Sequence, residues 1–224
     1  MITVILMMAG SSSRMSGNEN KLFLELGDKL VFQHSLDLFL EYGFNVICVT
    51  KEEYKKYLTN YTDKVKIVLG GETRQESVYN GLKATNDEYV MIHDAARPFV
   101  SKRIIEDCLN VINEKSNFLV AAKSKDSIYI KTPLTGVNRD NIILAQTPQG
   151  GLTQDFLNVH LQAFNEGFVS TDDISLLLKY LNKDVKVIDG EDKNFKITTQ
   201  IDYILAKELV KLWLESGMLG ILIN

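Results

Sequence analysis

The stretch Met8-Ala9-Gly10-Ser11-Ser12-Ser13-Arg14-Met15 decides the fold, and it follows directly on the apolar run Ile2–Met7. An apolar run of this length predicts a buried strand. Small side chains after a strand let backbone N–H groups at the start of a helix approach an anion closely. Arg14 and Lys21 add two positive charges seven positions apart. The stretch therefore predicts either a triphosphate-binding loop or an ordinary tight turn with two surface cations.

Two better-known phosphate loops are excluded by the sequence. A Walker A loop needs the pattern Gly-x-x-x-x-Gly-Lys-Ser/Thr, which does not occur in the chain. A dinucleotide-binding turn needs Gly-x-Gly-x-x-Gly, but Gly10 is followed by three serines. The loop is therefore of a third kind, in which Arg14 and Lys21 stand in place of the Walker lysine.

Composition narrows the class of protein. A chain of 224 residues with 45% hydrophobic and 24% charged residues is typical of one sizeable soluble domain. The net charge of -4 argues against a dedicated nucleic-acid binder. No stretch approaches the ~20 apolar residues of a membrane span, and the N-terminal run is too short for a signal peptide. Cys48 and Cys108 are expected to be buried thiols. We therefore expect a cytoplasmic protein with no nucleic-acid or membrane partner.

Strand-like and helix-like segments alternate along the first half of the chain. Apolar runs lie at Ile2–Met7, Asn45–Thr50, Val65–Val68, Tyr89–Ile92 and Phe118–Ala122. Helical periodicity lies between them at Val31–Tyr42, Gln75–Lys83 and Lys102–Asn113. This alternation predicts βαβ units and a mostly parallel sheet, in an α/β domain. Ligands bind such sheets beyond the carboxyl ends of the strands, so the loops after the strands are the candidate site.

The loop after the third run reads Gly70-Gly71-Glu72-Thr73-Arg74-Gln75-Glu76-Ser77. Thr73 is expected to cap the following helix, with Glu76 completing a capping box. The two glycines permit backbone conformations that other residues resist. They would also leave space for a base or sugar that Ser77 hydrogen-bonds. Both interpretations apply to the same loop.

The loop after the fourth run reads His93-Asp94-Ala95-Ala96-Arg97-Pro98. A carboxylate at the end of a buried strand, followed by two small residues, suits a Mg²⁺ ligand beside phosphates. The alternative is that Asp94 forms a structural ion pair with Arg97.

The pattern changes after residue 124. Ser127–Lys131 alternates in polarity, and Asn141–Ala145 is a second strand-like run beyond a polar loop. These runs predict two strands of a protruding hairpin arm at about 125–150, within a single domain of residues 1–224. The exposed edge of such an arm is often covered by a partner chain. Gln146–Gly151 is interpreted as a sharp return to the body.

The last third of the chain is predicted to contain three helices and two strands. A helix over Thr153–Asn165 ends at Gly167, and Thr171 or Asp172 caps the next helix. Strands are expected at Val185–Ile188 and Asn194–Thr198. The final helix is expected at Asp202–Glu215, with an apolar stripe formed by Ile204, Leu205, Leu209 and Leu212.

With these loops assembled, the chain resembles the 2-C-methyl-D-erythritol 4-phosphate cytidylyltransferases of isoprenoid-precursor synthesis. Six motifs carry the resemblance in the right order, from Ile5 to about Ala206. They are Ala9–Met15 with Asn20–Phe23, Gly70–Val78, His93–Phe99, Gln146–Gln149, Thr171–Asp173 and Asn194–Thr198.

The resemblance implies a Rossmann-like, GT-A-like nucleotidyltransferase fold with helices on both faces of the sheet, and a homodimer joined through the arm. It implies transfer of a cytidylyl group from CTP to 2-C-methyl-D-erythritol 4-phosphate with release of pyrophosphate. The family roles fall on named positions of this chain. Arg14 and Lys21 are the catalytic cations, and Asp94 holds Mg²⁺. The implied substrate-binding residues are Ala9, Gly10, Gly71, Glu72 and Ser77 for cytidine, Lys196, Thr147 and Thr171 for the sugar phosphate, and also Arg74, Ala95 and Arg97.

The chain departs from the family pattern at two places of consequence. Gln162 stands where some relatives carry an arginine that grips the sugar phosphate from the partner subunit, and glutamine cannot supply that charge. Lys193 stands where some relatives have an aspartate, so a second metal carboxylate near Asp192 is not implied. Gln162 remains among the substrate-binding candidates.

Two alternative functions remain. A ribitol 5-phosphate cytidylyltransferase has the same fold and chemistry, but its relatives tend to carry Ser and Val where this chain has Ala95 and Ala96. Gln162 keeps that alternative open. A non-catalytic nucleotide sensor is the alternative of another class, and the intact Arg14, Lys21 and Asp94 argue against it.

The implied reaction needs no protein base, because the attacking phosphate oxygen is already an anion near neutral pH. Catalysis then reduces to positioning and charge stabilisation. The three histidines, His34, His93 and His160, therefore need no catalytic role.

Overall fold

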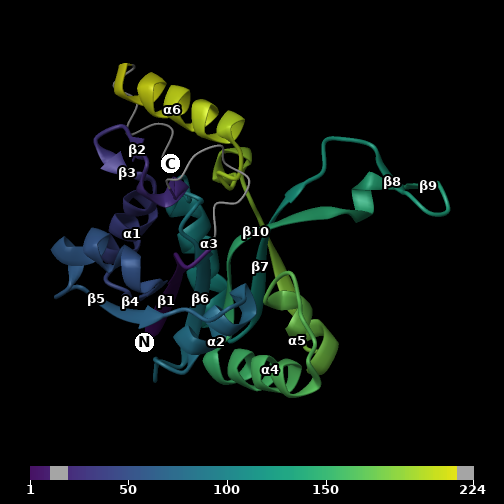
Figure 1. The fold of residues 1–224 in the computed structure, drawn as a ribbon. Helices are drawn as coiled ribbons and strands as arrows, with labels where there is room; N and C mark the ends of the chain where they lie inside the picture. The colour runs from purple at the N-terminus through teal and green to yellow at the C-terminus, as the bar shows by residue number, and fades with distance from the viewer. Residues whose placement is uncertain (11–19, 216–224) are drawn as a thin grey trace.

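The computed structural model of the chain describes residues 1–10 and 20–215, with side chains described up to residue 212. A seven-stranded sheet crosses this part of the chain in the order β11-β7-β10-β6-β1-β4-β5 (Figure 1). β10 is antiparallel to β6 and β7, and the other neighbouring strands are parallel. The prediction of a mostly parallel α/β sheet is confirmed. The strands are β1 (Ile2–Met7), β4 (Asn45–Thr50), β5 (Val65–Leu69), β6 (Tyr89–Asp94), β7 (Asn117–Lys123), β10 (Ile143–Leu152) and β11 (Val185–Asp189).

The central strand β1 is apolar at every position except Thr3 because it faces a core on both sides. Val4 and Leu6 belong to one hydrophobic core, and Ile5 and Met7 belong to the other. Successive side chains of a strand point to opposite faces, so an unbroken apolar run is required where helices cover both faces. The first core is covered by α1 (Val31–Glu41), α3 (Lys102–Asn113) and α6 (Gln200–Glu215), the second by α2 (Arg74–Leu82), α4 (Thr153–Glu166) and α5 (Ile174–Tyr180) (Figure 1).

Two short 3₁₀ helices pack against each other beside the end of β1. They are η1 (Lys21–Phe23) and η2 (Glu52–Tyr61). Phe23 stacks on Tyr57 with ring centroids 3.8 Å apart and lies 4.8 Å from the ring of Tyr54. This aromatic contact fixes η1, and hence Lys21, against the segment that follows β4. The two-residue strands β2 (Glu25–Leu26) and β3 (Lys29–Leu30) complete the connection to α1.

The predicted helix ends in the second half are confirmed. Gly167 ends α4 in the left-handed conformation, with a φ of 64°, which favours glycine. At the start of α5, Asp172 Oδ1 accepts a hydrogen bond from the Ser175 N–H at 3.1 Å. Asp172 is therefore the capping side chain. The helix begins at Ile174, and Gln149 Oε1 also accepts from its N–H at 3.2 Å.

The protruding arm exists, but one of its two strands was predicted wrongly. β8 (Ile128–Ile130) pairs with β9 (Thr135–Val137), not with the run at 141–145 (Figure 1). That run instead opens β10, which continues to Leu152 between β7 and β6. The predicted return turn at Gln146–Gly151 is therefore strand. Ile143–Ala145 pair with β7 alone, whereas Gln149 and Gly150 pair with β7 on one side and β6 on the other. The second half of β10 therefore has its backbone N–H and C=O groups satisfied on both sides, which a hairpin partner could not do.

The strand predicted at Asn194–Thr198 is also wrong. Asp192–Asn194 forms a 3₁₀ helix, η4, and the next residues are irregular. The alternation that suggested a strand has another cause. Ile197 is fully buried and its N–H bonds the carbonyl of Ala96 at 2.8 Å, whereas Lys196 points to the opposite side and reaches Asp94.

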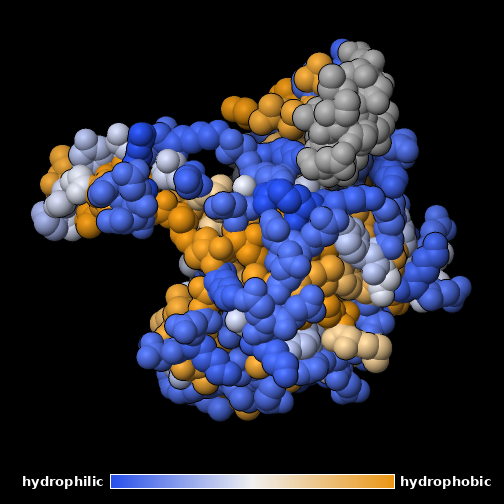
Figure 2. Space-filling view, turned by 180° about the vertical axis from the view of Figure 1, so that it is seen from behind, coloured by the Kyte–Doolittle hydropathy of each residue, from blue (hydrophilic) through white to orange (hydrophobic). Residues whose placement is uncertain are grey.

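Of the apolar stripe predicted for the last helix, Leu209 packs against the core and the other three residues do not. Ile204, Leu205 and Leu212 of α6 are exposed, and Ala206 and Val210 are the buried residues of this helix. Figure 2 shows apolar surface on α6 and on the arm. The larger side chains were mistaken for the core face because size and hydrophobicity dominate a sequence pattern. No helix in the described part of the chain is long and apolar enough to cross a bilayer.

The two cysteines are buried and free, as predicted. Both belong to the core covered by α1 and α3. Burial raises the pKa of the Cys48 thiol to about 12. A thiol that stays protonated is a poor nucleophile and metal ligand, so the cysteines serve packing.

Candidate active site

The carboxyl ends of β1, β4, β5 and β6 surround a cavity of about 310 Å³. This volume lies within the usual range of small-ligand sites. Ten residues from the strand-end loops converge there because neighbouring parallel strands end at the same edge of the sheet. The lining residues named by the sequence analysis are Ala9, Gly10, Lys21, Gly71, Glu72, Arg74, Ser77, Asp94, Ala96 and Lys196.

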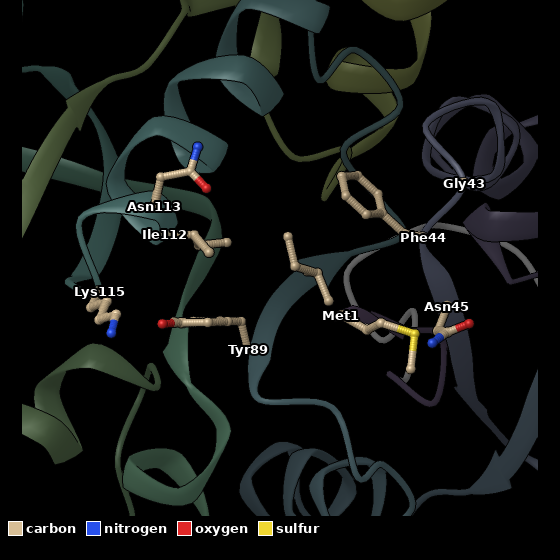
Figure 3. Close-up of a pocket in the computed structure, with 9 residues that line it drawn as sticks. Met1, Gly43, Phe44, Asn45, Tyr89, Ile112, Asn113 and Lys115 are labelled. Carbon is tan, nitrogen blue, oxygen red and sulfur yellow. The ribbon is translucent and has the colours of Figure 1, made fainter.

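A second cavity, of about 460 Å³, lies at the opposite end of the sheet (Figure 3). Met1, Asn45 and Tyr89 line it at the first residues of the strands, with Phe44 and Lys115 around them. Its lining contains no carboxylate and one lysine. The charged side chains expected of the site therefore line the cavity at the carboxyl ends, although the other cavity is larger.

Asp94 stands at the floor of the site and is ionised. Its side chain is 11% exposed, and Oδ2 accepts a hydrogen bond from Lys196 Nζ at 2.9 Å. Arg74 Nε lies 3.7 Å from Oδ1, and Arg97 Nε lies 3.9 Å from Oδ2. Burial alone would raise the pKa of this carboxyl, but Lys196, Arg74 and Arg97 together hold it well below its usual range. The ion pair expected with Arg97 exists, but Lys196 makes the closer contact.

Arg74, Asp173 and His160 form a series of contacts that runs from Asp94 into the protein. Arg74 donates two hydrogen bonds to Asp173, at 3.1 and 2.7 Å, in a bidentate pair. Asp173 is 1% exposed, and its Oδ1 lies 3.3 Å from His160 Nε2. Burial opposes ionisation of Asp173, but Arg74 outweighs it and lowers the pKa to about 2. Arg74 therefore links the carboxylate at the start of α5 to the carboxylate at the end of β6.

Asp94 fits a magnesium ion as a single protein ligand. Within residues 1–10 and 20–215, no group of three or more His, Cys, Asp or Glu side chains could hold a metal. Mg²⁺, however, is commonly bound by one or two carboxylates together with substrate phosphates and water. Oδ2 is engaged by Lys196, and Oδ1 makes no hydrogen bond to the described residues. Asp192, the position considered for a second carboxylate, pairs instead with Lys125 on the surface.

Thr147 and His93 orient Asp94 from behind. Thr147 Oγ1 accepts a hydrogen bond from the Asp94 N–H at 3.1 Å and lies 3.1 Å from His93 Nδ1. His93 Nε2 lies 3.1 Å from the carbonyl oxygen of Arg97, so this nitrogen carries the proton and Nδ1 accepts from the threonine. Burial lowers the pKa of His93 to about 4. The ring is therefore a neutral structural group.

The glycine loop is shaped by close packing. Neither Gly70 nor Gly71 has a positive φ, so the expectation of a special backbone conformation is wrong. A Cβ on Gly70 would lie 2.6 Å from the Cβ of Ala9, and one on Gly71 would lie 2.2 Å from Glu76 Cδ. Gly70 thus lets the loop lie directly against Ala9 at the end of β1, and Gly71 leaves room for the side chain of Glu76.

Side chains at the start of α2 hold this loop in place. Thr73 Oγ1 accepts from the Glu76 N–H at 3.0 Å, as predicted for the cap. The Glu76 carboxylate accepts from the Glu72 N–H at 2.8 Å, one residue before the expected position. Ser77 Oγ donates to the Thr73 carbonyl at 2.8 Å and accepts from the Gly71 N–H at 3.0 Å. Ser77 therefore supports the glycine loop, and its hydrogen bond to cytidine stays a prediction.

Several predicted site residues lie away from the cavity in this chain. Ala95 is fully buried, and its neighbour Ala96 lines the cavity instead. Arg97 donates to the carbonyl of Asn194 at 2.8 Å. Thr171 is exposed and does not line the cavity. Gln162 lies on α4, where it bonds Glu166. Arg14 lies outside the described residues.

Two residues of the site were missed in the sequence. Lys51 lines the cavity and directly follows β4. The candidate residues came from the loops after the first, third and fourth predicted strands, and β4 is the second. Asp173 anchors Arg74 across 99 positions of sequence. Lys51 could have been found by applying the strand-end rule to every strand, whereas no local signal marks Asp173 as the partner of Arg74.

Comparison with known proteins agrees with this geometry. The family model of 2-C-methyl-D-erythritol 4-phosphate cytidylyltransferase matches residues 2–211. A protein of that name from Prochlorococcus marinus is 38% identical, over 93% of this chain and 98% of its own length. One from Clostridium tetani is 38% identical, over 92% of this chain and 89% of its own length.

Solved structures show the same likeness. The 4-diphosphocytidyl-2C-methyl-D-erythritol synthase of Anaerococcus prevotii superposes with a TM-score of 0.82 at 29% identity, covering 94% of this chain and 98% of that one. The 2-C-methyl-D-erythritol 4-phosphate cytidylyltransferase of Thermus thermophilus gives 0.79 at 27% identity, covering 92% and 98%. Sequence and fold agree over nearly the whole length. The chain therefore belongs to the 2-C-methyl-D-erythritol 4-phosphate cytidylyltransferase family.

Proposed function

We propose that this chain transfers the cytidylyl group of CTP to 2-C-methyl-D-erythritol 4-phosphate and releases pyrophosphate, as a cytoplasmic step of isoprenoid-precursor synthesis. Family membership supports the reaction. The observation that carries the proposal is the convergence of Lys21, Lys196 and Asp94 on one cavity at the carboxyl edge of the sheet. Two lysines suit a substrate with several phosphates, and a carboxylate beside them suits its metal ion.

The reaction exchanges one phosphorus–oxygen bond for another. An oxygen of the sugar phosphate attacks the α-phosphorus of CTP, and the bond to pyrophosphate breaks on the opposite side. The nucleophile is already an anion, so no protein group removes a proton. Both ring nitrogens of His93 are already engaged in hydrogen bonds, so this histidine is not available as a base.

The protein then acts by holding two anions together and stabilising the charge that develops. Lys21 and Arg14 are the proposed catalytic cations, as the family resemblance implies. Lys196 is proposed to position the sugar phosphate, and the Ala9–Gly10 and Gly71–Glu72 segments to hold cytidine. Mg²⁺, when bound by Asp94, would neutralise phosphate charge and orient the leaving group.

Pyrophosphate release from CTP tests the proposal directly. The purified protein should release pyrophosphate with 2-C-methyl-D-erythritol 4-phosphate, and Lys21→Ala should lower kcat roughly 10²-fold because an electrostatic donor is lost. Lys55→Ala is the matched control, since Lys55 pairs with Glu52 on the surface. Faster release with ribitol 5-phosphate would establish the alternative polyol substrate. CTP binding without release from either polyol phosphate would establish a sensor.

We also propose a homodimer joined through the arm. Tyr129, Ile130 and Leu134 of the arm are 63%, 53% and 77% exposed. Exposed apolar clusters on a projecting hairpin are typical of an interaction surface. A second copy of the chain is the proposed occupant because the family resemblance implies a dimer through this element.

A further inference from the structure

We infer that Lys51 is a nucleotide-binding residue that donates a hydrogen bond to the pyrimidine base. The inference deepens the proposed function, on which it rests, because it assigns one more side chain to the CTP site. Lys51 belongs to none of the six motifs that carry the family resemblance.

The position of Lys51 is fixed by the central strands. It directly follows β4, which lies between β1 and β5. The Met8 N–H bonds the carbonyl of Val49 at 2.8 Å, and the Gly70 N–H bonds the carbonyl of Thr50 at 2.9 Å. The ends of all three strands are therefore tied together one or two residues before Lys51. Lys51 emerges between the two backbone segments proposed to hold cytidine.

The side chain of Lys51 is placed to meet a ligand. It is half-buried and lines the cavity, and its Nζ lies 5.8 Å from the centroid of the Tyr54 ring. Within the described residues, Lys51 has no carboxylate partner or side-chain hydrogen bond. Arg74 and Lys196, which line the same cavity, are already paired with Asp173 and Asp94. The contact with the Tyr54 ring uses none of the three N–H donors of Lys51, so these donors are available to an acceptor on the ligand.

Lys51 lies nearer to the proposed site of the base than to Asp94, where the phosphates are proposed to bind. Asp94 ends β6, which lies on the far side of β1 from β4. Strands are spaced about 4.8 Å apart, so the end of β4 is roughly 10 Å from that of β6. The Gly70–Gly71 loop, by contrast, follows the strand next to β4.

The hydrogen-bonding groups of cytosine determine which of its atoms Lys51 can contact. An ammonium group only donates hydrogen bonds. Cytosine offers two acceptors, O2 and the ring nitrogen N3, whereas its exocyclic amino group is a donor. Lys51 therefore pairs with the O2–N3 edge. The amino group is left to acceptors elsewhere in the site.

Binding of CTP and CMP to Lys51→Met, measured by calorimetry, tests the inference. Methionine keeps the length and apolar stem of lysine but removes the charged donor. A charge-assisted hydrogen bond is lost, so both ligands should bind about tenfold more weakly. Equal losses for CTP and CMP exclude a contact to the outer two phosphates, because the two ligands share the base, the ribose and the α-phosphate. The free base cytosine, which has neither ribose nor phosphate, should lose affinity by the same factor if Lys51 contacts the base.

Lys56→Met is the matched control. Lys56 lies on η2, the 3₁₀ helix that begins directly after Lys51, with its Nζ 5.1 Å from the Tyr57 ring, but it is exposed and does not line the cavity. Its substitution should leave both affinities unchanged. In steady-state kinetics, Lys51→Met should raise the KM for CTP and leave the KM for the sugar phosphate unchanged.

Three results would overturn the inference. Unchanged CTP affinity in Lys51→Met removes the residue from the site, and a loss confined to CTP assigns it to the phosphates instead. Wild-type protein that binds no CTP would overturn the proposed function and this inference together. The first two results leave the proposed function intact, so the two failures are distinguishable.

Discussion

Asp94 stays ionised in a nearly buried position because three cations surround it. Lys196 makes the direct hydrogen bond, and the guanidinium groups of Arg74 and Arg97 lie 3.7 and 3.9 Å away. An isolated carboxyl at this depth would tend to take up a proton. The cluster therefore keeps Asp94 negatively charged at the rim of the sheet, as the proposed Mg²⁺ site requires.

Asp94→Asn should sharply raise the Mg²⁺ concentration needed for half-maximal turnover. The amide keeps the shape of the side chain but loses the charge that attracts the ion. A Mg²⁺ titration of pyrophosphate release measures the change. Asp192→Asn is the control, because Asp192 pairs with Lys125 on the surface. An Asp94→Asn titration that overlays the wild type would remove this residue from the metal site.

His93 predicts how stability depends on pH. Burial lowers its pKa to about 4 in the folded protein, compared with about 6.5 in the unfolded chain. Between these values the unfolded chain binds more protons, so the free energy of unfolding should fall as the pH drops from about 6.5 to 4. The slope is at most about 1.4 kcal/mol per pH unit for this group.

Urea unfolding at pH 7, 6 and 5 measures that slope, and His93→Gln should reduce it. Burial also lowers the pKa of His34, so part of the slope should remain in the variant. The comparison uses the change with pH and not the absolute stability, because the substitution itself costs hydrogen bonds. Equal slopes in wild type and His93→Gln would contradict the assignment.

At the scale of elements, the bidentate pair of Arg74 and Asp173 joins α2 to the start of α5. The same arginine approaches Asp94 at the end of β6. Three elements are thus fixed relative to one another beside the cavity. Asp173 acts on the site through Arg74, which makes it a positioning residue.

Asp173→Asn should lower the free energy of unfolding by about 2–3 kcal/mol, because Arg74 loses its main counter-charge. The estimate is below that for a completely buried pair, since the Arg74 side chain is 31% exposed. Chemical denaturation provides the measurement. Asp172→Asn is the matched control, because its carboxylate caps α5 and should cost about 1 kcal/mol or less. Equal losses in the two variants would contradict the special role of Asp173.

At the scale of the whole molecule, the arm extends away from the sheet and exposes apolar side chains (Figures 1 and 2). Its two short strands bond to each other and pack little against the body. A two-stranded hairpin is marginally stable by itself in water. In the proposed dimer, a second copy of the chain would bury this apolar surface and stabilise the arm.

A double substitution tests that arrangement. Ile130→Glu with Leu134→Glu places two charges where the interface is proposed, so the molar mass in solution should fall from dimer to monomer. Light scattering on a sizing column gives the mass. Lys131→Glu is the control for a charge change on the same hairpin that removes no apolar surface. A mass that stays at the dimer in the double variant would exclude the arm as the interface.

The site could be located from the sequence because its signals are local. An apolar run, a cap or a glycine before a helix acts over a few residues, so the order of strands and helices could be predicted with their approximate ends. The rule that strand-end loops meet at one edge then brought Gly10, Lys21, Gly71 and Asp94 together. The same rule, applied to β4, would have included Lys51.

The sequence by itself determined the α/β class, the mostly parallel sheet, the family and the loops that form the site. Only the tertiary structure decided that β10 inserts between β6 and β7, that α6 turns Ala206 and Val210 inward, and that Arg74 is held by Asp173. These features depend on pairings between residues far apart in the chain. Such pairings are selected by the burial and hydrogen bonding of the assembled fold, and no short stretch of sequence records which distant partner satisfies them.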